Sequence, residues 1–255
     1  MNTAVLRQED ISFQATLYES QNLVRRWLHN SRREWVMKTL ESISPSRCKY
    51  LEVGIGCGIY TKEMSMRGWV TAIDINEQFV KEANRLSNVK AQVADIMETR
   101  FPARHHVAVC SEVIEHIPDS LKALRNIRAS LNAQGYLILT TPNSYSTMEI
   151  FARLLAFGPI VKLARLIYGE SVDDLGHINR LTRHQLRDQI EKAGFTVIRQ
   201  NNIGLYIPVI AEFGGRPGLA LSQWLATWMA ESPLLSNLLW TQCWLLRKRK
   251  GEPHV

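Results

Sequence analysis

The chain has 255 residues, of which 45% are hydrophobic and 22% are charged, and its formal net charge is +7 at pH 7. Such a chain can bury one ample core and has the profile of a soluble globular domain with appended segments, so it needs no disulfide bonds. No segment has the roughly 18 uninterrupted apolar residues of a transmembrane helix, and the first 14 residues lack a secretory pattern. We therefore expect a cytoplasmic protein.

The cysteines and the basic residues do not indicate a metal site or a nucleic-acid partner. No metal-ligand spacing occurs among the cysteines, and three of them lie in or beside apolar runs, which predicts reduced core thiols. The cysteines are Cys48, Cys57, Cys110 and Cys243. Dense positive charge is confined to residues 247–250 and to two arginine pairs at 25–26 and 32–33. We interpret these as solvated helix faces and a charged tail.

Short β-rich apolar runs alternate with helical stretches between Lys49 and Asn202, which is typical of a parallel sheet built from βα units. Strands are predicted at 50–53, 70–73, 89–93, 107–110, 136–140, 196–200 and 241–246. The fold class is therefore α/β, with a doubly wound, mostly parallel sheet of seven strands.

Several helices between these strands have readable ends. Asn76 is expected to cap one helix, and the apolar residues of the next share one face, which ends before Gly135. Those apolar residues are Leu121, Leu124, Ile127 and Leu131. Thr182 and Gln185 have the spacing of a capping box, and Gly194 is expected to end that helix.

Two apolar, helical segments interrupt the alternation, at 144–176 and at 203–239. The first leaves from the carboxyl end of the fifth strand, where open α/β sheets bind their ligands, so we expect a substrate lid. The second carries Trp224 and Trp228 one helical turn apart, and we expect it to cap the first.

A glycine-rich turn follows the first strand, in the run Glu52-Val53-Gly54-Ile55-Gly56-Cys57-Gly58. Glycine is required where backbone takes positive φ or closely approaches a ligand. Asp74 ends the second strand, where its carboxylate can accept both ribose hydroxyls of a nucleoside. Asp95 follows the third strand and is expected to meet an adenine amino group.

Five ordered motifs between Tyr50 and Phe195 resemble the class I S-adenosylmethionine-dependent methyltransferases, in the branch that includes ubiquinone-biosynthesis O-methyltransferases. They are the glycine turn with Glu52, Asp74, Asp95-Ile96, the run 111–117 (SEVIEHI) and the run 135–143 (GYLILTTPN). The later run 176–182 (GHINRLT) with Ala193-Gly194-Phe195 is similar to the joint between lid and helix in that branch.

The resemblance implies a Rossmann-like methyltransferase fold whose seventh strand runs antiparallel beside the sixth. It also implies S-adenosylmethionine as cofactor, and the expected contacts are Glu52, Gly54, Ile55, Gly56, Gly58, Asp74, Ile75, Asp95, Ile96, Ser111 and Glu112. The chain then divides into a helical segment (1–48), the cofactor core (49–143), the lid (144–176), the continued core (177–202), the second insert (203–239) and the seventh strand with a basic tail (240–255).

Two other functions remain open at this point. A nicotinamide dinucleotide enzyme also uses a glycine turn, but its last two glycines are three positions apart, whereas Gly56 and Gly58 are two apart. A catalytically inactive binding or scaffold protein would retain the fold, although all the cofactor motifs are present.

Methyl transfer from a sulfonium is an in-line displacement, so the protein aligns the partners and removes a proton when the acceptor is a hydroxyl. His116, just past the fourth strand, is the first candidate base, with a structural role as its alternative. His177 is the second, at the end of the lid. Arg32 matches the cofactor carboxylate in shape and charge, and a solvated helix position is its alternative.

The apolar lid predicts a small-molecule acceptor that is apolar, lipid-like or glycolipid-like. Arg153, Lys162 and Arg165 make the lid basic and amphipathic, which favours peripheral contact with an anionic inner-membrane surface. Packing of the lid helices on the sheet is the simpler interpretation of the same pattern.

Overall fold

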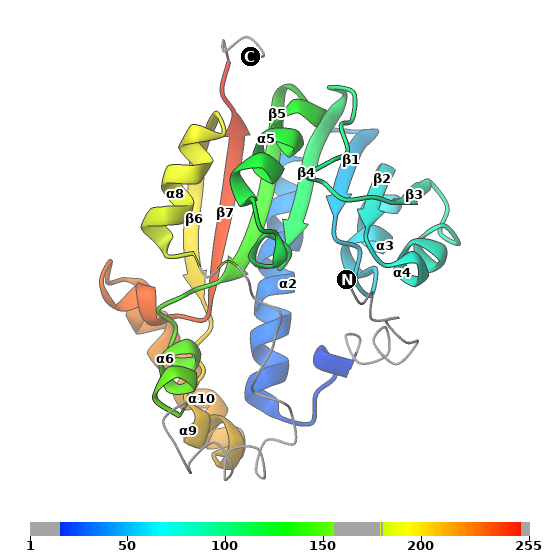
Figure 1. The fold of residues 1–255 in the computed structure, drawn as a ribbon. Helices are drawn as coiled ribbons and strands as arrows, with labels where there is room; N and C mark the ends of the chain where they lie inside the picture. The colour runs from blue at the N-terminus through cyan, green and yellow to red at the C-terminus, as the bar shows by residue number, and fades with distance from the viewer. Residues whose placement is uncertain (1–15, 156–178, 180, 251–255) are drawn as a thin grey trace.

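A computed structural model describes residues 16–155, 179 and 181–250 (Figure 1). Its centre is one sheet of seven strands in the order β3-β2-β1-β4-β5-β7-β6. The strands are β1 (Cys48–Val53), β2 (Gly68–Asp74), β3 (Val89–Val93), β4 (His105–Ser111), β5 (Leu131–Pro142), β6 (Phe195–Ile203) and β7 (Thr241–Lys248). All seven predicted strands are confirmed, and most are longer than predicted at their ends.

The strand directions are those of the predicted fold class. The pairs that join β1 to β5 are all parallel, whereas β7 lies between β5 and β6 and pairs antiparallel with both. The predicted antiparallel last strand is therefore confirmed. Because β1 to β5 are parallel, their carboxyl ends meet at one edge of the sheet, and this edge carries the candidate site.

Helices cover both faces of the sheet, as the apolar runs in the strands require. On one face lie α2 (Leu23–Ile43), α3 (Ile59–Ser65) and α4 (Glu77–Ala83), and on the other lie α5 (Ser120–Ser130) and α8 (Arg183–Lys192). Successive strand residues alternate between these cores: Leu137 and Leu139 of β5 belong to the α5 and α8 side, and Ile138 belongs to the α2 side.

The helix ends largely follow the sequence signals. The Asn76 side chain accepts a hydrogen bond from the N–H of Gln78, and Thr182 and Gln185 form the predicted capping box. Gly194 follows α8 with a φ of 81°. One boundary differs, because α5 ends at Ser130 and Leu131 already belongs to β5, so the last apolar residue of the predicted stripe is a strand residue.

The second insert forms α9 (Pro208–Phe213), α10 (Gly215–Ala230) and the short 3-10 helix η2 (Leu235–Leu238), and it packs against the first half of α2. The start of α6 (Thr147–Leu155) touches it, since Thr147 Oγ1 donates to the carbonyl oxygen of Tyr206 at 2.5 Å. Trp224 and Trp228 are 64% and 54% exposed, because α10 turns Gly218, Ser222, Ala226 and Met229 inward. Most of the segment that this insert is expected to cap lies outside the described residues.

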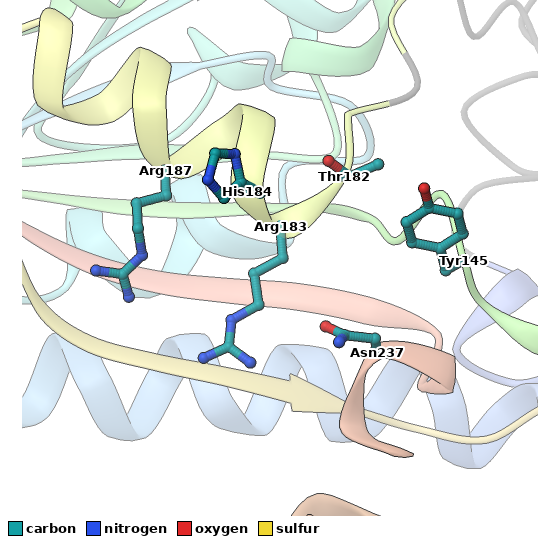
Figure 2. Close-up of a pocket in the computed structure, with 6 residues that line it drawn as sticks. All are labelled: Tyr145, Thr182, Arg183, His184, Arg187 and Asn237. Carbon is teal, nitrogen blue, oxygen red and sulfur yellow. The ribbon is translucent and has the colours of Figure 1, made fainter. Parts of the chain in front are cut away.

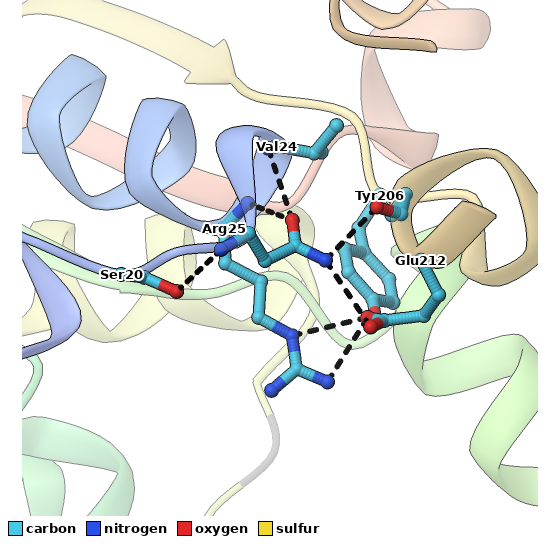
Figure 3. Close-up of polar contacts among 7 residues, drawn as sticks. Ser20, Val24, Arg25, Tyr206 and Glu212 are labelled. Atoms are coloured by element: carbon cyan, nitrogen blue, oxygen red, sulfur yellow. Dashed lines mark hydrogen bonds and ion pairs between the residues drawn. The ribbon is translucent and has the colours of Figure 1, made fainter. Parts of the chain in front are cut away.

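A polar network holds the second insert to α2 (Figure 3). The Glu212 carboxylate accepts hydrogen bonds from Arg25 Nε at 3.1 Å, Asn22 Nδ2 at 3.1 Å and the Tyr206 hydroxyl at 2.5 Å. Asn22 also caps α2, since its Oδ1 accepts from the N–H groups of Val24 and Arg25. One carboxylate thus joins the beginning of α2 to both ends of the 206–212 segment.

Three of the four cysteines are core residues, as expected from the apolar runs around them: Cys48, Cys110 and Cys243 are all fully buried on strands. Within the described parts of the chain, no helix has the length and apolar character needed to cross a membrane.

Candidate functional site

The glycine turn between β1 and α3 lies at the carboxyl edge of the sheet. Its three glycines have φ values of 81°, 53° and 74°, a region that disfavours side chains with a Cβ. Gly54 has a second constraint, because a Cβ there would lie 2.2 Å from Cγ2 of Val113. A Cβ at Gly58 would meet only Thr61 Oγ1, at 3.8 Å, so that part of the turn is open. Gly54 therefore serves packing, and Gly58 serves the backbone conformation.

Glu52 supports this turn from the protein interior. Its side chain is 1% exposed, and Oε2 accepts a hydrogen bond from Thr61 Oγ1 of α3 at 2.5 Å, while Oε1 is buried with no partner. Burial raises the pKa of Glu52 to about 8, although the Thr61 hydrogen bond lowers it. The carboxyl therefore keeps its proton to a higher pH than a solvated glutamate does, and it joins the end of β1 to α3.

Asp74 ends β2 and faces the glycine turn. Its Oδ2 accepts hydrogen bonds from the N–H groups of Ile55 at 2.7 Å and Gly56 at 3.2 Å, and its Oδ1 accepts from the N–H of Asn76 at 2.9 Å. A carboxylate has about four acceptor positions, so room remains for a ribose hydroxyl. The structure thus adds a role that the sequence did not predict, because Asp74 also sets the shape of the turn.

The residues after β2 and β3 form the next part of the edge. Ile75 is 75% exposed although it is apolar, while Ile96 is buried in the core beside α5. Asp95 is half-buried, and its Oδ1 accepts from the N–H of Met97 at 2.8 Å. An exposed apolar side chain next to an acidic residue at this edge is suited to one face of a purine ring.

Ser111 ends β4, Glu112 follows it, and both side chains contact Thr140 of β5. The Ser111 and Thr140 hydroxyls lie 2.8 Å apart, and Thr140 Oγ1 donates to Glu112 Oε1 at 3.0 Å. Glu112 has a φ of 56°, which is strained for a residue with a Cβ. Its other oxygen, Oε2, lies 2.8 Å from Nη1 of Arg32. Thr140 was not predicted, although the polar ending of an otherwise apolar strand was a signal for it.

Arg32 reaches this edge from α2 and is buried, so the solvated alternative does not apply. Burial alone would lower the pKa of its guanidinium, but Glu112, Tyr18 and Tyr60 together outweigh that effect and the pKa is raised overall. The guanidinium carbon lies 5.1 Å from the ring centroid of Trp240, and Nε is buried without a partner. Arg32 is therefore a fixed, buried cation at the site.

Of the two candidate bases, only His116 lies within the described residues. His116 ends a 3-10 turn, η1 (Ile114–His116), and is exposed beside the buried Glu115. Burial and the nearby Glu112 raise the pKa of Glu115 well above its usual range, and its carboxylate accepts from Thr141 Oγ1 at 2.9 Å. His177 lies outside the described residues, as does most of the predicted lid.

The structure thus brings most of the predicted site residues to one edge of the sheet, at the ends of β1, β2, β3 and β4, with Arg32 added from α2. No group of three or more side chains suited to a metal ion occurs in the part of the chain that the structure describes.

The sequence profile of the methyltransferase domain family matches residues 24–200, which is more than half of the chain. The chain belongs to this family. It is therefore a class I S-adenosylmethionine-dependent methyltransferase by family, as its motifs predicted.

Curated relatives are similar over part of their length. The chain is 31% identical over 127 residues to a ubiquinone biosynthesis O-methyltransferase of Bordetella bronchiseptica, a match that covers 46% of this chain and 52% of the relative. It is 29% identical over 126 residues to the enzyme of that name from Coxiella burnetii, covering 42% and 54%. The chain thus spans about half the length of these relatives.

Solved structures share the fold at low sequence identity. The N-methyltransferase NodS of Bradyrhizobium japonicum, in complex with S-adenosyl-L-homocysteine, has a TM-score of 0.57 at 13% identity, covering 94% of this chain and 95% of that one. Magnesium protoporphyrin IX methyltransferase of Synechocystis, also with S-adenosyl-L-homocysteine bound, has a TM-score of 0.58 at 14% identity and the same coverage. These likenesses concern the fold.

Proposed function

We propose that this protein transfers a methyl group from S-adenosylmethionine to a hydroxyl of an apolar, lipid-like small molecule. The observation that carries the proposal is the row of polar residues along one sheet edge: the glycine turn, then Asp74, Asp95 and Ser111-Glu112. The curated relatives, which are O-methyltransferases by name, support an oxygen acceptor.

The residues at this edge suit the parts of the cofactor. In our proposal Asp74 holds the ribose, Asp95 and the exposed Ile75 receive the adenine, and the positive charge of Arg32 attracts the methionine carboxylate. Glu52 acts as a positioning residue, since it contacts Thr61 in the interior. The sulfonium, when bound, supplies the electrophilic methyl carbon, and the protein orients the acceptor oxygen in line with it.

His116 is the proposed general base. It is exposed at the end of η1, just past β4 at the ligand edge, whereas the neighbouring Glu115 is buried and holds Thr141. Replacing His116 by asparagine should lower kcat by roughly 100-fold while leaving cofactor affinity unchanged. His177 is kept as the second candidate, to be tested by the same substitution.

The acceptor is proposed to be apolar because of the residues that follow β5. Tyr145, Met148 and Phe151 are all exposed although they are large and apolar, and they lie where the chain leaves the ligand edge of the sheet. Exposed apolar side chains beside a polar cofactor site fit an apolar acceptor placed next to the methyl group.

Peripheral contact with an anionic membrane is the second part of the proposal, and it places the enzyme in the cytoplasm at the inner-membrane surface. Figure 1 shows α6, α9 and α10 together at one end of the molecule. Trp224 and Trp228 are exposed on α10, and Phe213 is exposed at the end of α9. Tryptophan side chains favour the membrane interface, because they have an apolar ring and a polar N–H group.

Two vesicle experiments test the membrane contact. Replacing Trp224 and Trp228 by serine should weaken sedimentation with phosphatidylglycerol vesicles, whereas serine at Trp69, which is 62% exposed on β2, should not. The triple substitution of Arg153, Lys162 and Arg165 by glutamine should weaken the free energy of binding to anionic vesicles by about 1 kcal/mol for each charge removed. If the unaltered protein does not sediment with anionic vesicles, the acceptor is reached without a membrane.

The catalytic proposal is tested by methyl transfer from labelled S-adenosylmethionine to fractionated lipid, quinone and sugar extracts. We expect label in a lipid or quinone fraction, and base-stable linkage to oxygen in the product. Cofactor binding without label in any fraction would instead support the scaffold alternative, and binding of a nicotinamide dinucleotide would contradict both.

A further inference from the structure

A cavity separate from the polar row lies between α8, η2 and the segment after β5 (Figure 2). Its volume is about 340 Å³, and it is lined by Tyr145, Thr182, Arg183, His184, Arg187 and Asn237. The surface of the cavity is mostly apolar, so it suits a molecule with a ring or a chain. None of these residues belongs to the proposed cofactor site.

Positive charge is concentrated on the α8 side of this cavity. Arg183 and Arg187 are four residues apart on one face of α8 and extend in the same direction in Figure 2. Nη1 of Arg187 lies 3.8 Å from Oε1 of Glu191, and its guanidinium carbon lies 5.7 Å from the ring centroid of Trp244. By contrast, among the described residues no carboxylate is within ion-pair distance of Arg183. Burial and the charge of Arg187 lower the pKa of Arg183.

The arrangement of these groups suits an oxyanion. Two guanidinium groups that face one cavity repel each other, and an anion between them removes that repulsion and accepts bidentate hydrogen bonds. The cavity is also at the N-terminal end of α8, where the aligned peptide dipoles favour negative charge. Asn237 of η2 completes the lining, and its Oδ1 is buried without a hydrogen-bond partner.

We infer that this cavity, here called the α8 cavity, binds the anionic group of the acceptor, a phosphate or a carboxylate carried on an apolar body. The inference rests on the proposed function, because Tyr145 belongs both to the cavity and to the apolar stretch that follows β5. The methyl-accepting end of the molecule then lies toward the sheet edge, and its charged end lies between Arg183 and Tyr145.

Binding of simple probes tests the inference without turnover. Phenyl phosphate, benzoate and benzyl alcohol share one ring and differ in charge, so their affinities, measured by NMR titration, isolate the anionic group. We expect phenyl phosphate to bind the unaltered protein at least tenfold more tightly than benzyl alcohol, and R183Q to abolish that preference. R183K should retain part of it, since lysine keeps the charge but loses the planar fork.

A matched control is R125Q, which removes an exposed arginine of α5 away from the cavity and should leave all three affinities unchanged. Dihexanoyl phosphatidate serves as a second probe: tighter binding than phenyl phosphate assigns the anion to a lipid headgroup, and weaker binding assigns it to a soluble molecule. Equal affinity for phenyl phosphate and benzyl alcohol, or equal loss in R183Q and R125Q, overturns the inference.

A second measurement on the same samples distinguishes failure of the α8 cavity assignment from failure of the proposed methyl transfer. Affinity for S-adenosyl-L-homocysteine is measured on the same samples by calorimetry, and R183Q should not change it. If S-adenosyl-L-homocysteine binds and phenyl phosphate does not, only the assignment of the α8 cavity fails. If S-adenosyl-L-homocysteine does not bind, the proposed methyl transfer fails, whatever the affinities of the other probes.

Discussion

Nη1 of Arg32 lies 2.8 Å from Oε2 of Glu112, and this ion pair joins the long N-terminal helix α2 to the strained turn after β4. The two residues are 80 positions apart in the sequence, and both side chains are largely withdrawn from solvent. Part of the N-terminal segment is therefore a wall of the proposed cofactor site.

Removing the cation of this pair should destabilise the protein. Arg32→Met leaves the Glu112 carboxylate without its counter-charge, and we expect the free energy of unfolding to fall by about 3 kcal/mol. Urea denaturation measures this change. Arg33→Met is the control, because Arg33 is more exposed and lies 3.7 Å from Glu63, so its loss should cost less than about 1 kcal/mol. An equal fall in the free energy of unfolding in the two variants would mean that the Arg32–Glu112 pair stabilises the protein no more than a surface ion pair does.

Asp74→Asn tests the ribose assignment with the smallest change of shape. Asparagine retains one acceptor oxygen but loses the charge, so affinity for S-adenosyl-L-homocysteine should fall by roughly 10- to 100-fold. Calorimetry at a temperature where the variant is folded gives the value. Asp119→Asn, at the cap of α5, should bind normally. Unchanged affinity in Asp74→Asn would remove Asp74 from the cofactor site.

Glu52 should make the stability of the protein fall as pH rises. Its folded pKa of about 8 exceeds the value of about 4.5 expected for the unfolded chain, so the folded state binds the extra proton between these values. The stabilisation is complete below pH 4.5 and is lost progressively up to pH 8, by as much as ~1.4 kcal/mol per pH unit.

Glu52→Gln should flatten this dependence, because the amide imitates the protonated acid and still accepts from Thr61. Unfolding curves at pH 5.5, 6.5 and 7.5 provide the test. Glu115 shifts in the same direction, so Glu115→Gln is measured alongside to separate the two contributions. A parallel pH profile for the native protein and both variants would contradict the assigned protonation.

The Glu212 network should control the attachment of the second insert. Glu212→Ala removes the acceptor shared by Arg25, Asn22 and Tyr206. We expect the free energy of unfolding to fall by about 2 kcal/mol and the amides of residues 203–239 to exchange faster. Hydrogen exchange with mass spectrometry resolves the segment. Glu231→Ala, at the exposed end of α10, should leave exchange unchanged.

Phe151 separates acceptor binding from cofactor binding. Phe151→Ser should lower kcat/KM for the true acceptor by about tenfold, because an exposed phenyl ring is removed from the apolar stretch after β5. Affinity for S-adenosyl-L-homocysteine should not change, since Phe151 lies on α6 and the proposed cofactor residues lie at strand ends. Loss of both would indicate a structural role for this side chain.

Local patterns of the sequence were sufficient for the sheet and for bringing the proposed cofactor residues to one edge of it. The strands were recognisable because buried parallel strands are short apolar runs, and the turn was recognisable because only glycine accepts three positive φ angles so close together. Asp74 and Asp95 were assigned because an acidic residue directly after a parallel strand must lie at the ligand edge.

Only the tertiary structure could decide which distant residues meet. The Arg32–Glu112 pair, the Glu212 network and the α8 cavity each join segments far apart in the chain, and no periodic pattern records such a meeting. The exposure of Trp224 and Trp228 shows the same limit, because helical spacing places two residues on one face of a helix but does not determine what that face contacts. Period and turn chemistry are local properties of a chain, whereas the partner of a charged or apolar side chain depends on how the elements pack.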